Sequence, residues 1–293
     1  MVNKFGISPE QLNNIIDTAL NEDIGSGDVT SDTLIPPGLH GRAYLLVKAE
    51  GVLAGIDLVR EIFRRVDPAL TFDILFQDGS RIKRGDIIAT VSGRVSSILT
   101  PERVSLNFLQ KLSGIATQTA QLVVGAGDLP VTILDTRKTT PGLRALERYA
   151  VRVGGGKNHR FNLTDLILIK DNHLVAMRAL GMSLKEIIAK ARENSPLSLK
   201  IEVEVTSPEE ALEAVEAGAD IIMPDNMSPD EMRHLISLLP FNVKTEASGG
   251  VTVDNIREVA ASGVNFISSG ALTHSTKALD ISIELEPDSV RLL

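Results

Sequence analysis

The sequence contains no cysteine and no apolar run long enough to span a bilayer. The absence of cysteine excludes disulfide bonds, zinc sites built from thiolates and a cysteine nucleophile. The N-terminal stretch also lacks the apolar core of a secretory signal peptide, so we expect a soluble, cytoplasmic protein that does not associate with membranes. With 293 residues, 43% of them hydrophobic, the chain is able to bury a substantial core in one large domain or two ordinary ones.

The net charge of −8 at pH 7 disfavours nucleic acid as a partner, because the field of the protein repels a phosphate backbone. One window has the opposite balance. From Arg137 to Lys170 there are eight Lys and Arg residues against two Asp and Glu, a local charge of +6, which indicates a site for a small anion. For Arg144, Arg148 and Arg152 an alternative is open, because their spacing of four also fits the solvated face of a helix.

From about residue 131 the chain repeats a short β-branched run, a polar turn and an amphipathic helical stretch, which is the alternation of parallel β/α units. The six expected strands are residues 131–135, 166–170, 200–205, 220–223, 242–246 and 265–268. Two helix starts are clear, since Ser207 and Ser228 are each followed by Pro and by acids that suit the helix dipole.

The first hundred residues lack this repeat and predict an α+β region, with a helix over 8–20 and short strands broken by Gly and Pro. The tail from 279 to 286 alternates apolar and polar residues as a strand does. We therefore predict an N-terminal α/β sandwich over residues 1–112, to which residues 276–293 return, and a β/α barrel domain over residues 113–275.

Polar residues follow the expected strands, and in parallel β/α folds the reactive groups lie at the carboxyl ends of strands. The first strand runs into Arg137, the second into Lys170 and the fourth into Asp225. In the third strand Glu202 and Glu204 alternate with β-branched residues and share one face. Inside a barrel they would need a cation or a metal, whereas on an amphipathic edge strand they would need neither. Oxygen ligands without a His or Cys set favour Mg²⁺ carried by a phosphorylated substrate.

Two glycine turns follow the last two expected strands. They contain Ser248, Gly249 and Gly250 in the first case and Ser269 and Gly270 in the second. Glycine lets backbone amides approach an anion closely, and late barrel loops use this arrangement for phosphate. The pair of turns therefore predicts a phosphate site.

A run of three glycines, residues 154–156, precedes His159 and Arg160. The run does not match a P-loop, because Val151 stands where the first glycine should be and Asn158 replaces Ser or Thr. We interpret it as a flexible loop that delivers His159 and Arg160 to a ligand.

Longer motifs are recognisable along the chain. They include residues 22–31 (EDIGSGDVTS), 101–110 (PERVSLNFLQ), 135–144 (DTRKTTPGLR), 169–173 (IKDNH) and 246–250 (EASGG). In these motifs the chain resembles the quinolinate phosphoribosyltransferases over nearly its whole length. The resemblance implies a type II phosphoribosyltransferase fold, with an N-terminal α/β sandwich and an incomplete seven-stranded β/α barrel, one strand more than the sequence pattern predicts. It also implies a homodimer with shared active sites, with further assembly left open.

The resemblance implies a reaction in which phosphoribosyl pyrophosphate and quinolinate give nicotinate mononucleotide, pyrophosphate and carbon dioxide, a step of de novo NAD biosynthesis. The two quinolinate carboxylates would be held by Arg137, His159, Arg160 and Lys170, together with Arg103 from the neighbouring subunit.

The remaining implied roles concern the ribose and its phosphates. Lys138, Glu202 and Asp225 are the implied catalytic residues, and Glu202 and Asp225 would also hold Mg²⁺, directly or through water or substrate. The implied substrate-binding residues near the 5-phosphate are Ser248, Gly249, Gly250, Ser269 and Gly270.

Two other functions remain open at this point. A paralogue of the same fold, of the type associated with molybdate transport, would act on a different anionic ring and would not need the second set of cations that Arg137, Arg160 and Lys170 belong to. A non-catalytic anion-binding or carrier protein on the same barrel would gain nothing from Glu202 and Asp225 beside a phosphate.

Overall fold

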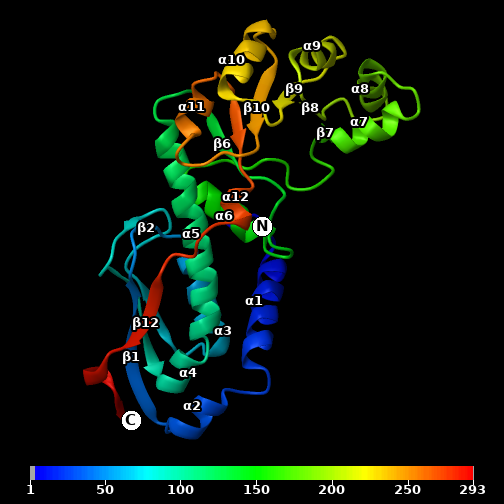
Figure 1. Cartoon of the computed structure of the whole chain (residues 1–293). Helices are drawn as coiled ribbons and strands as arrows, with labels where there is room; N and C mark the ends of the chain where they lie inside the picture. The colour runs from blue at the N-terminus through cyan, green and yellow to red at the C-terminus, as the bar shows by residue number, and fades with distance from the viewer. Residues whose placement is uncertain (1–3, 293) are drawn as a thin grey trace. The chain divides into compact units, whose positions relative to one another are not determined.

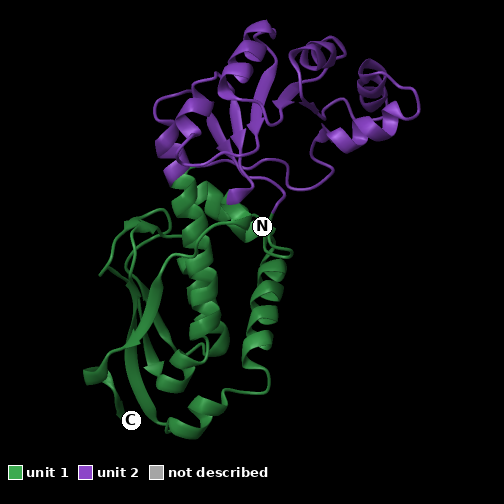
Figure 2. Cartoon of the chain, viewed as in Figure 1, with its two compact units in different colours: residues 1–120, 139–155, 272–293 green, residues 121–138, 156–271 purple. Residues whose placement is uncertain are grey.

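The computed structural model describes residues 4–292, which form two compact units (Figure 1, Figure 2). Within this part of the chain, unit 1 contains residues 4–120, 139–155 and 272–292, and unit 2 contains residues 121–138 and 156–271. The predicted domain boundary after residue 112 stays a prediction. No helix among residues 4–292 combines the length and the apolar character needed to cross a membrane.

Unit 1 is built on an antiparallel sheet with the strand order β12-β1-β5-β3, and β13 also pairs with β1. The strands of this unit are β1 (Leu39–Val47), β2 (Gly51–Val52), β3 (Thr71–Ile74), β4 (Arg81–Ile82), β5 (Ile87–Arg94), β12 (Ile281–Leu285) and β13 (Arg291–Leu292). The short strands β2 and β4 pair with each other. The strand expected in the tail is confirmed as β12, and Figure 1 shows it in red beside the blue β1.

Unit 1 also contains several helices. They are α1 (Pro9–Ile24), α2 (Val29–Leu34), α3 (Ile56–Val66), α4 (Val95–Leu99), α6 (Arg144–Val153), the 3₁₀ turn η1 (Pro287–Ser289) and the first part of α5 (Glu102–Ala126). On α3, Ile56, Val59 and Phe63 recur at helical spacing and are fully buried in the core of the unit. The helix expected over 8–20 is confirmed as α1, which is capped by Ser8 and ends only at Gly25, where φ is 55°.

Unit 2 contains a six-stranded parallel sheet with the order β6-β11-β10-β9-β8-β7. Its strands are β6 (Thr132–Leu134), β7 (Ile167–Ile169), β8 (Ile201–Val205), β9 (Ile221–Pro224), β10 (Lys244–Ser248) and β11 (Phe266–Ser268). All six expected strands are therefore confirmed. From β7 to β11 each strand pairs with the next in the chain, and β11 pairs back onto β6. This is the order of a β/α barrel that is open between its first and second strands.

The resemblance implied seven barrel strands, and the structure describes six within residues 4–292. On the open side of β6, Lys157 makes a single isolated parallel bridge to Leu134. One bridge is too short to form a strand, so this side of β6 carries an irregular segment in place of a further strand.

The helices of unit 2 are α7 (Asp171–Arg178), α8 (Leu184–Glu193), α9 (Pro208–Glu216), α10 (Pro229–Leu238), α11 (Ile256–Ala260) and the start of α12 (Ala271–His274). The two helix starts predicted from the sequence are confirmed. The hydroxyl of Ser207 accepts the backbone N–H of Glu210 at the start of α9, and that of Ser228 accepts the N–H of Glu231 at the start of α10. These caps fix where the loops after β8 and β9 end.

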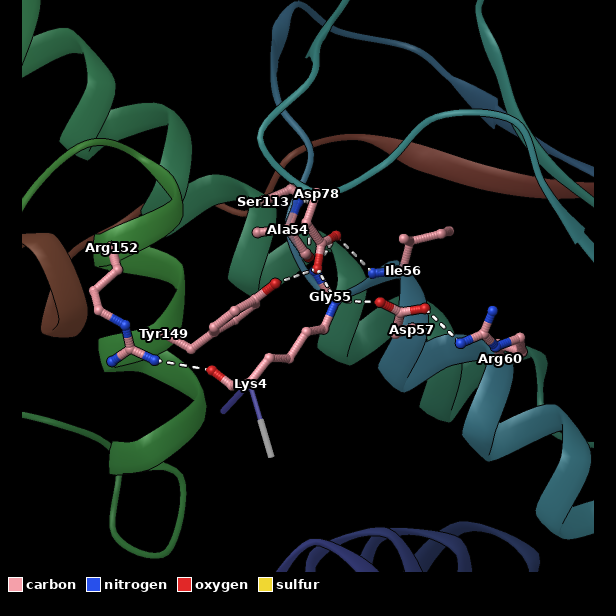
Figure 3. Close-up of polar contacts among 10 residues, drawn as sticks. All are labelled: Lys4, Ala54, Gly55, Ile56, Asp57, Arg60, Asp78, Ser113, Tyr149 and Arg152. Carbon is pink, nitrogen blue, oxygen red and sulfur yellow. Dashed lines mark hydrogen bonds and ion pairs between the residues drawn. The ribbon is translucent and has the colours of Figure 1, made fainter. Parts of the chain in front are cut away.

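In unit 1 the carboxylate of Asp78 joins three segments of the chain (Figure 3). Its Oδ1 accepts the N–H groups of Gly55 and Ile56, at 2.8 and 3.0 Å, where α3 begins. Its Oδ2 accepts the hydroxyl of Tyr149 on α6 at 2.6 Å and the ammonium of Lys4 at 2.9 Å. The Asp78 side chain is only 6% exposed, so these donors replace the water that a carboxylate would otherwise bind.

The N-terminal segment is held to α3 and α6 by further contacts (Figure 3). Lys4 also pairs with Asp57, and its carbonyl accepts a hydrogen bond of 3.0 Å from Arg152. Burial acts to lower the pKa of Lys4, but the hydrogen bonds to Asp57 and Asp78 raise it above its ordinary value. Burial and the Asp78 carboxylate likewise raise the pKa of Tyr149, so its hydroxyl keeps the proton that it donates.

The three arginines of α6 therefore do not form a simple solvated face. Arg148 is buried, with 7% of its surface exposed. Arg144 donates from Nε to the Thr139 hydroxyl at 3.0 Å, and Arg152 binds the N-terminal segment. These contacts lie within unit 1, so this part of the cationic window stabilises the fold.

We expect Tyr149→Phe to lower the free energy of unfolding by about 1–3 kcal/mol, because it removes one donor from a buried carboxylate. Tyr44→Phe is the matched control: the Tyr44 hydroxyl lies 3.4 Å from Glu284 in a partly exposed position, and its loss should cost less than about 0.5 kcal/mol. Urea unfolding of the three proteins at pH 7, followed by circular dichroism, measures the difference. Equal costs for the two variants would contradict the role given to Asp78.

Candidate active site

The residues selected from the sequence lie mostly in unit 2, at the strand ends from which the loops leave. Because the six strands run in parallel, their carboxyl ends, from which these loops leave, all lie at the same end of the sheet. The exits carry Arg137 and Lys138 after β6, Lys170 after β7, Asp225 after β9, Ser248, Gly249 and Gly250 at and after the end of β10, and Ser269 and Gly270 after β11. The parallel register thus collects residues that are up to 133 positions apart, from 137 to 270.

Glu202 lies inside the sheet, on β8, with β7 and β9 as its neighbours. The alternative of an amphipathic edge strand is therefore wrong. The Glu202 side chain is fully buried, whereas Glu204, two residues further along the same face, is partly exposed. Burial raises the pKa of Glu202, and the imidazole of His159 acts in the opposite direction.

His159 lies between two buried carboxylates from different strands. Its Nε2 is 3.3 Å from Glu202 Oε2 and 3.4 Å from Glu246 Oε2, and Glu246 on β10 is 1% exposed. Its Nδ1 accepts the N–H of Arg160 at 2.8 Å, which places the ring hydrogen on Nε2, facing the carboxylates.

The environment of His159 pulls its pKa in two directions. Burial acts to lower it, but Glu202 and Glu246 more than compensate, so the pKa is raised above its ordinary value. The backbone N–H of Arg160 acts against protonation of His159 at Nδ1, because it donates a hydrogen bond to the unprotonated Nδ1. The carboxylates therefore favour a charged ring, and charging it requires the contact with the amide to open.

The backbone of this loop is held by Asp135, which follows β6 and is fully buried. Its Oδ1 accepts the N–H of His159 at 2.8 Å, and its Oδ2 accepts the side-chain amide of Asn158. Arg160 then donates from Nη1 to the carbonyl of Leu166, just before β7, at 3.0 Å. The loop that carries His159 and Arg160 is thus attached to both strands that border the barrel opening.

Ligand atoms of His159, Glu202 and Glu246 lie within 4.8 Å of one another. A cation would bind the two carboxylates there, and His159 would become a third ligand only by giving up the hydrogen on Nε2. Both carboxylate oxygens of Glu202 and Oε1 of Glu246 are buried and have no hydrogen-bond partner among residues 4–292. Buried carboxylate oxygens without donors are costly, and a divalent ion or a donor group of a substrate would satisfy them.

Asp225, the other acid selected as a metal ligand, lies at a different level of the barrel. Glu202 pairs with Ile221 on β9, and Asp225 is four residues beyond Ile221. At roughly 3.3 Å per residue this is about 13 Å of strand. One ion therefore cannot bind both carboxylates directly. It would reach at least one of them through water or a substrate.

Asp225 lines a cavity of about 700 Å³ formed by the loops after β8 and β9 and by the helices that follow them. Its Oδ2 accepts the amide of Asn226 at 2.8 Å, and Asn226 has a φ of 54°, in the left-handed region. The cavity is lined by Thr206, Pro208, Asp225, Asn226, Met227, Asp230, Glu231 and His234. Asp225 is therefore available to a ligand at the outer end of the barrel.

The first glycine turn has the backbone conformation that requires glycine. Gly249 and Gly250 have φ values of 93° and 62°, and a Cβ at Gly249 would lie 3.1 Å from Asn226 Oδ1. The helix that follows, α11, begins only at Ile256, so the amides facing this turn are those of the loop. After β11, by contrast, α12 begins directly after Gly270.

The predicted anion-binding cations occupy different surroundings. Burial and the nearby Arg137 lower the pKa of Arg160. Lys170 stands at the N-cap position of α7, and its backbone N–H donates to His173 Nδ1 at 2.9 Å. Arg103 lies in unit 1, on α5, where it is exposed and lines a cavity of about 390 Å³ together with Asp28 and Glu102 among others.

Sequence reasoning did not select Glu246, Asp135 or Asn158 as site residues. The signal for Glu246 was a carboxylate inside an expected strand, the same signal that singled out Glu202. Asp135 was visible only as one polar residue at a strand end. Asn158 stood in the glycine-rich loop, and its pairing with Asp135 depends on the bridge between Lys157 and β6.

Comparison with known proteins adds a family to this geometry. Two family models match the chain: "Quinolinate phosphoribosyl transferase, N-terminal domain" over residues 28–113 and "Quinolinate phosphoribosyl transferase, C-terminal domain" over residues 115–284. A probable nicotinate-nucleotide pyrophosphorylase [carboxylating] of Bacillus subtilis (strain 168) is 45% identical over 275 residues, which is 94% of this chain and 93% of the relative.

Plant and structural relatives agree. Quinolinate phosphoribosyltransferase [decarboxylating] 2, mitochondrial, of Nicotiana glauca is 40% identical, covering 94% of this chain and 83% of the relative. The crystal structure of NadC from Streptococcus pyogenes superposes with a TM-score of 0.90 at 43% identity, over 96% of this chain and 98% of that chain. The chain belongs to the quinolinate phosphoribosyltransferase family.

Proposed function

We infer that this protein is an enzyme that transfers the phosphoribosyl group of phosphoribosyl pyrophosphate to quinolinate and releases carbon dioxide, a reaction of NAD biosynthesis. The observation that carries this inference is similarity at 40–45% identity over 94% of the chain to proteins named for this activity. The cationic and acidic residues at the barrel strand ends support it, because they match the charges of the two substrates.

Quinolinate carries two carboxylates on adjacent ring positions. Arg137, Arg160 and Lys170 supply the positive charge that holds it, and a planar guanidinium binds a carboxylate through two parallel hydrogen bonds. Arg103, which comes from unit 1, completes this group when it is contributed by a second subunit. His159 borders the same pocket through its neighbour Arg160.

The ribose side of the site carries the opposite charge. As pyrophosphate leaves C1 of the ribose, positive charge develops on the sugar, and the fixed carboxylates of Glu202 and Asp225 stabilise it. Mg²⁺, when bound with the substrate, neutralises the departing pyrophosphate. We assign Lys138, the neighbour of Arg137 in the chain, to the reacting groups, and the turns at Gly249 and Gly270 to the 5-phosphate.

Decarboxylation follows from the chemistry of the product ring. Once the pyridine nitrogen is ribosylated, its positive charge stabilises the electron pair left on the ring carbon when the adjacent carboxylate departs as carbon dioxide. A proton from water then takes the place of the carboxylate on that carbon. Apart from that proton, the step needs only the cations that hold the remaining carboxylate.

We also propose a homodimer in which Arg103 serves the partner's site, and a cytoplasmic location. The cytoplasmic location rests on the sequence of this chain. The relatives do not all share it, because the name of the Nicotiana glauca relative includes the word mitochondrial.

Release of carbon dioxide from carboxyl-labelled quinolinate tests the function directly. We expect release that requires quinolinate, phosphoribosyl pyrophosphate and Mg²⁺ together, that stops when EDTA removes the metal, and that nicotinate does not replace. Labelled carbon dioxide is trapped and counted, and nicotinate mononucleotide is identified by mass spectrometry. A folded protein that releases none would favour the paralogue that acts on another anionic ring.

We expect Arg137→Ala, Arg160→Ala and Lys170→Ala each to lower turnover by about a hundredfold or more, the loss that follows removal of one preorganised donor. Arg233→Ala is the matched control, because this exposed arginine on α10 forms an ion pair with Asp230 on the surface of the same helix. Steady-state kinetics with both substrates varied gives the comparison. Near-normal kinetics in all three site variants would reject this assignment.

Subunit complementation tests the role of Arg103. Arg103→Ala and Lys138→Ala dimers should each be inactive, and mixing them should restore part of the activity, because some hybrid dimers then contain one intact site. Exchange of subunits is verified with two differently tagged proteins. If hybrids form and no activity returns, the sites do not take Arg103 from a partner.

A further inference from the structure

The irregular segment on the open side of β6 carries two residues of the proposed quinolinate pocket. Lys157 donates its N–H to the carbonyl of Ile133 at 2.8 Å, and its own carbonyl accepts the N–H of Asp135 at 3.2 Å. These two hydrogen bonds seat the segment beside β6 for a single residue. The residues that follow, including His159 and Arg160, belong to no strand.

Beyond the bridge at Lys157, the segment is held by the carboxylate of Asp135. It is fully buried, and its two oxygens have different donors in the segment: Oδ1 accepts the backbone N–H of His159 at 2.8 Å, and Oδ2 accepts the side-chain amide of Asn158. A buried carboxylate is costly without such donors, so Asp135 strongly favours the one loop conformation that supplies them.

Two further contacts pass this constraint on to Arg160. With its backbone held by Asp135, the His159 ring reaches Glu202 and Glu246, and its Nδ1 receives the N–H of Arg160. The guanidinium of Arg160 then donates to the carbonyl of Leu166 at 3.0 Å. The direction of the Arg160 side chain therefore depends on a carboxylate that lies at the base of the loop.

We propose that Asp135 is a positioning residue of the quinolinate pocket, which acts through Asn158, His159 and Arg160 and touches no substrate itself. This inference rests on the proposed function, because it assigns the effect to quinolinate binding. It predicts that quinolinate binding requires a hydrogen-bond acceptor at one of positions 135 and 158 and a donor at the other. Which position carries the acceptor should matter less.

The acceptor and the donor of this pair can be exchanged. D135N keeps one oxygen for the His159 amide but turns its own amide toward that of Asn158, so two donors meet unless the Asn158 side chain turns over and abandons its native orientation. N158D brings two buried carboxylates together, so two acceptors meet. The double variant D135N/N158D again joins an amide to a carboxylate, and the remaining side-chain oxygen at position 135 is available to accept the N–H of His159.

The experiment compares D135N, N158D and D135N/N158D by steady-state kinetics with each substrate varied. We expect each single variant to raise KM for quinolinate by about tenfold or more, because small displacements of binding groups carry penalties of this order. KM for phosphoribosyl pyrophosphate should change by less than about twofold. The double variant should recover most of the affinity for quinolinate, which is the coupling expected of residues in direct contact.

Asp73→Asn is the matched control, since it removes an equal charge at an exposed position of β3 and should leave all constants unchanged. Circular dichroism and thermal unfolding establish that each variant is folded. If D135N does not fold, N158D and the double variant still decide the matter, because rescue is measured against N158D.

Three results would overturn the inference in an active wild-type enzyme: single variants with unchanged KM for quinolinate, equal effects on both substrates, or a double variant as impaired as the product of the single effects. A wild-type enzyme that does not use quinolinate would instead overturn the proposed function. The two failures are therefore distinguishable.

Discussion

The high cost of burying a carboxylate is the constraint on which the rest of unit 2 depends. Asp135, Glu202 and Glu246 come from the region of three different strands, each has an exposed fraction of 1% or less, and all three contact His159. None of them would be tolerated in this position alone. The loop that carries His159 has to enter the barrel to compensate them, and it brings Arg160 with it. The acids thus order the cations that bind the anionic substrate.

A comparison between the two units shows how a stabilising carboxylate differs from one that awaits a ligand. Asp78 in unit 1 receives four hydrogen bonds, and both of its oxygens are occupied. Glu202 and Glu246 in unit 2 each keep a buried oxygen without a hydrogen-bond partner within residues 4–292. Satisfied buried acids stabilise the fold, whereas unsatisfied ones indicate where a metal ion or a substrate hydroxyl is expected.

Glu202 and Asp225 serve the same proposed site from different depths of the barrel. Membership in the quinolinate phosphoribosyltransferase family accounts for the charges that the site needs. The strand register adds that Glu202 and Asp225 stand at different levels of the barrel, one deep and one beside the outer cavity. The two acids are therefore suited to different parts of an extended substrate such as a ribose with its pyrophosphate.

The sequence by itself determined the local features of the protein. Alternating β-branched runs identified all six parallel strands, and Ser207 and Ser228 marked helix starts, because periodicity and capping act between neighbours in the chain. Motifs identified the family, and the inward acid Glu202 was recognised from a pattern of period two. Only the tertiary structure decided that Glu246 and Asp135 surround His159, that α6 arginines such as Arg148 are structural, and that a single bridge borders β6 on its open side. These contacts join residues far apart in sequence, and their existence depends on strand order and register, which no local pattern specifies.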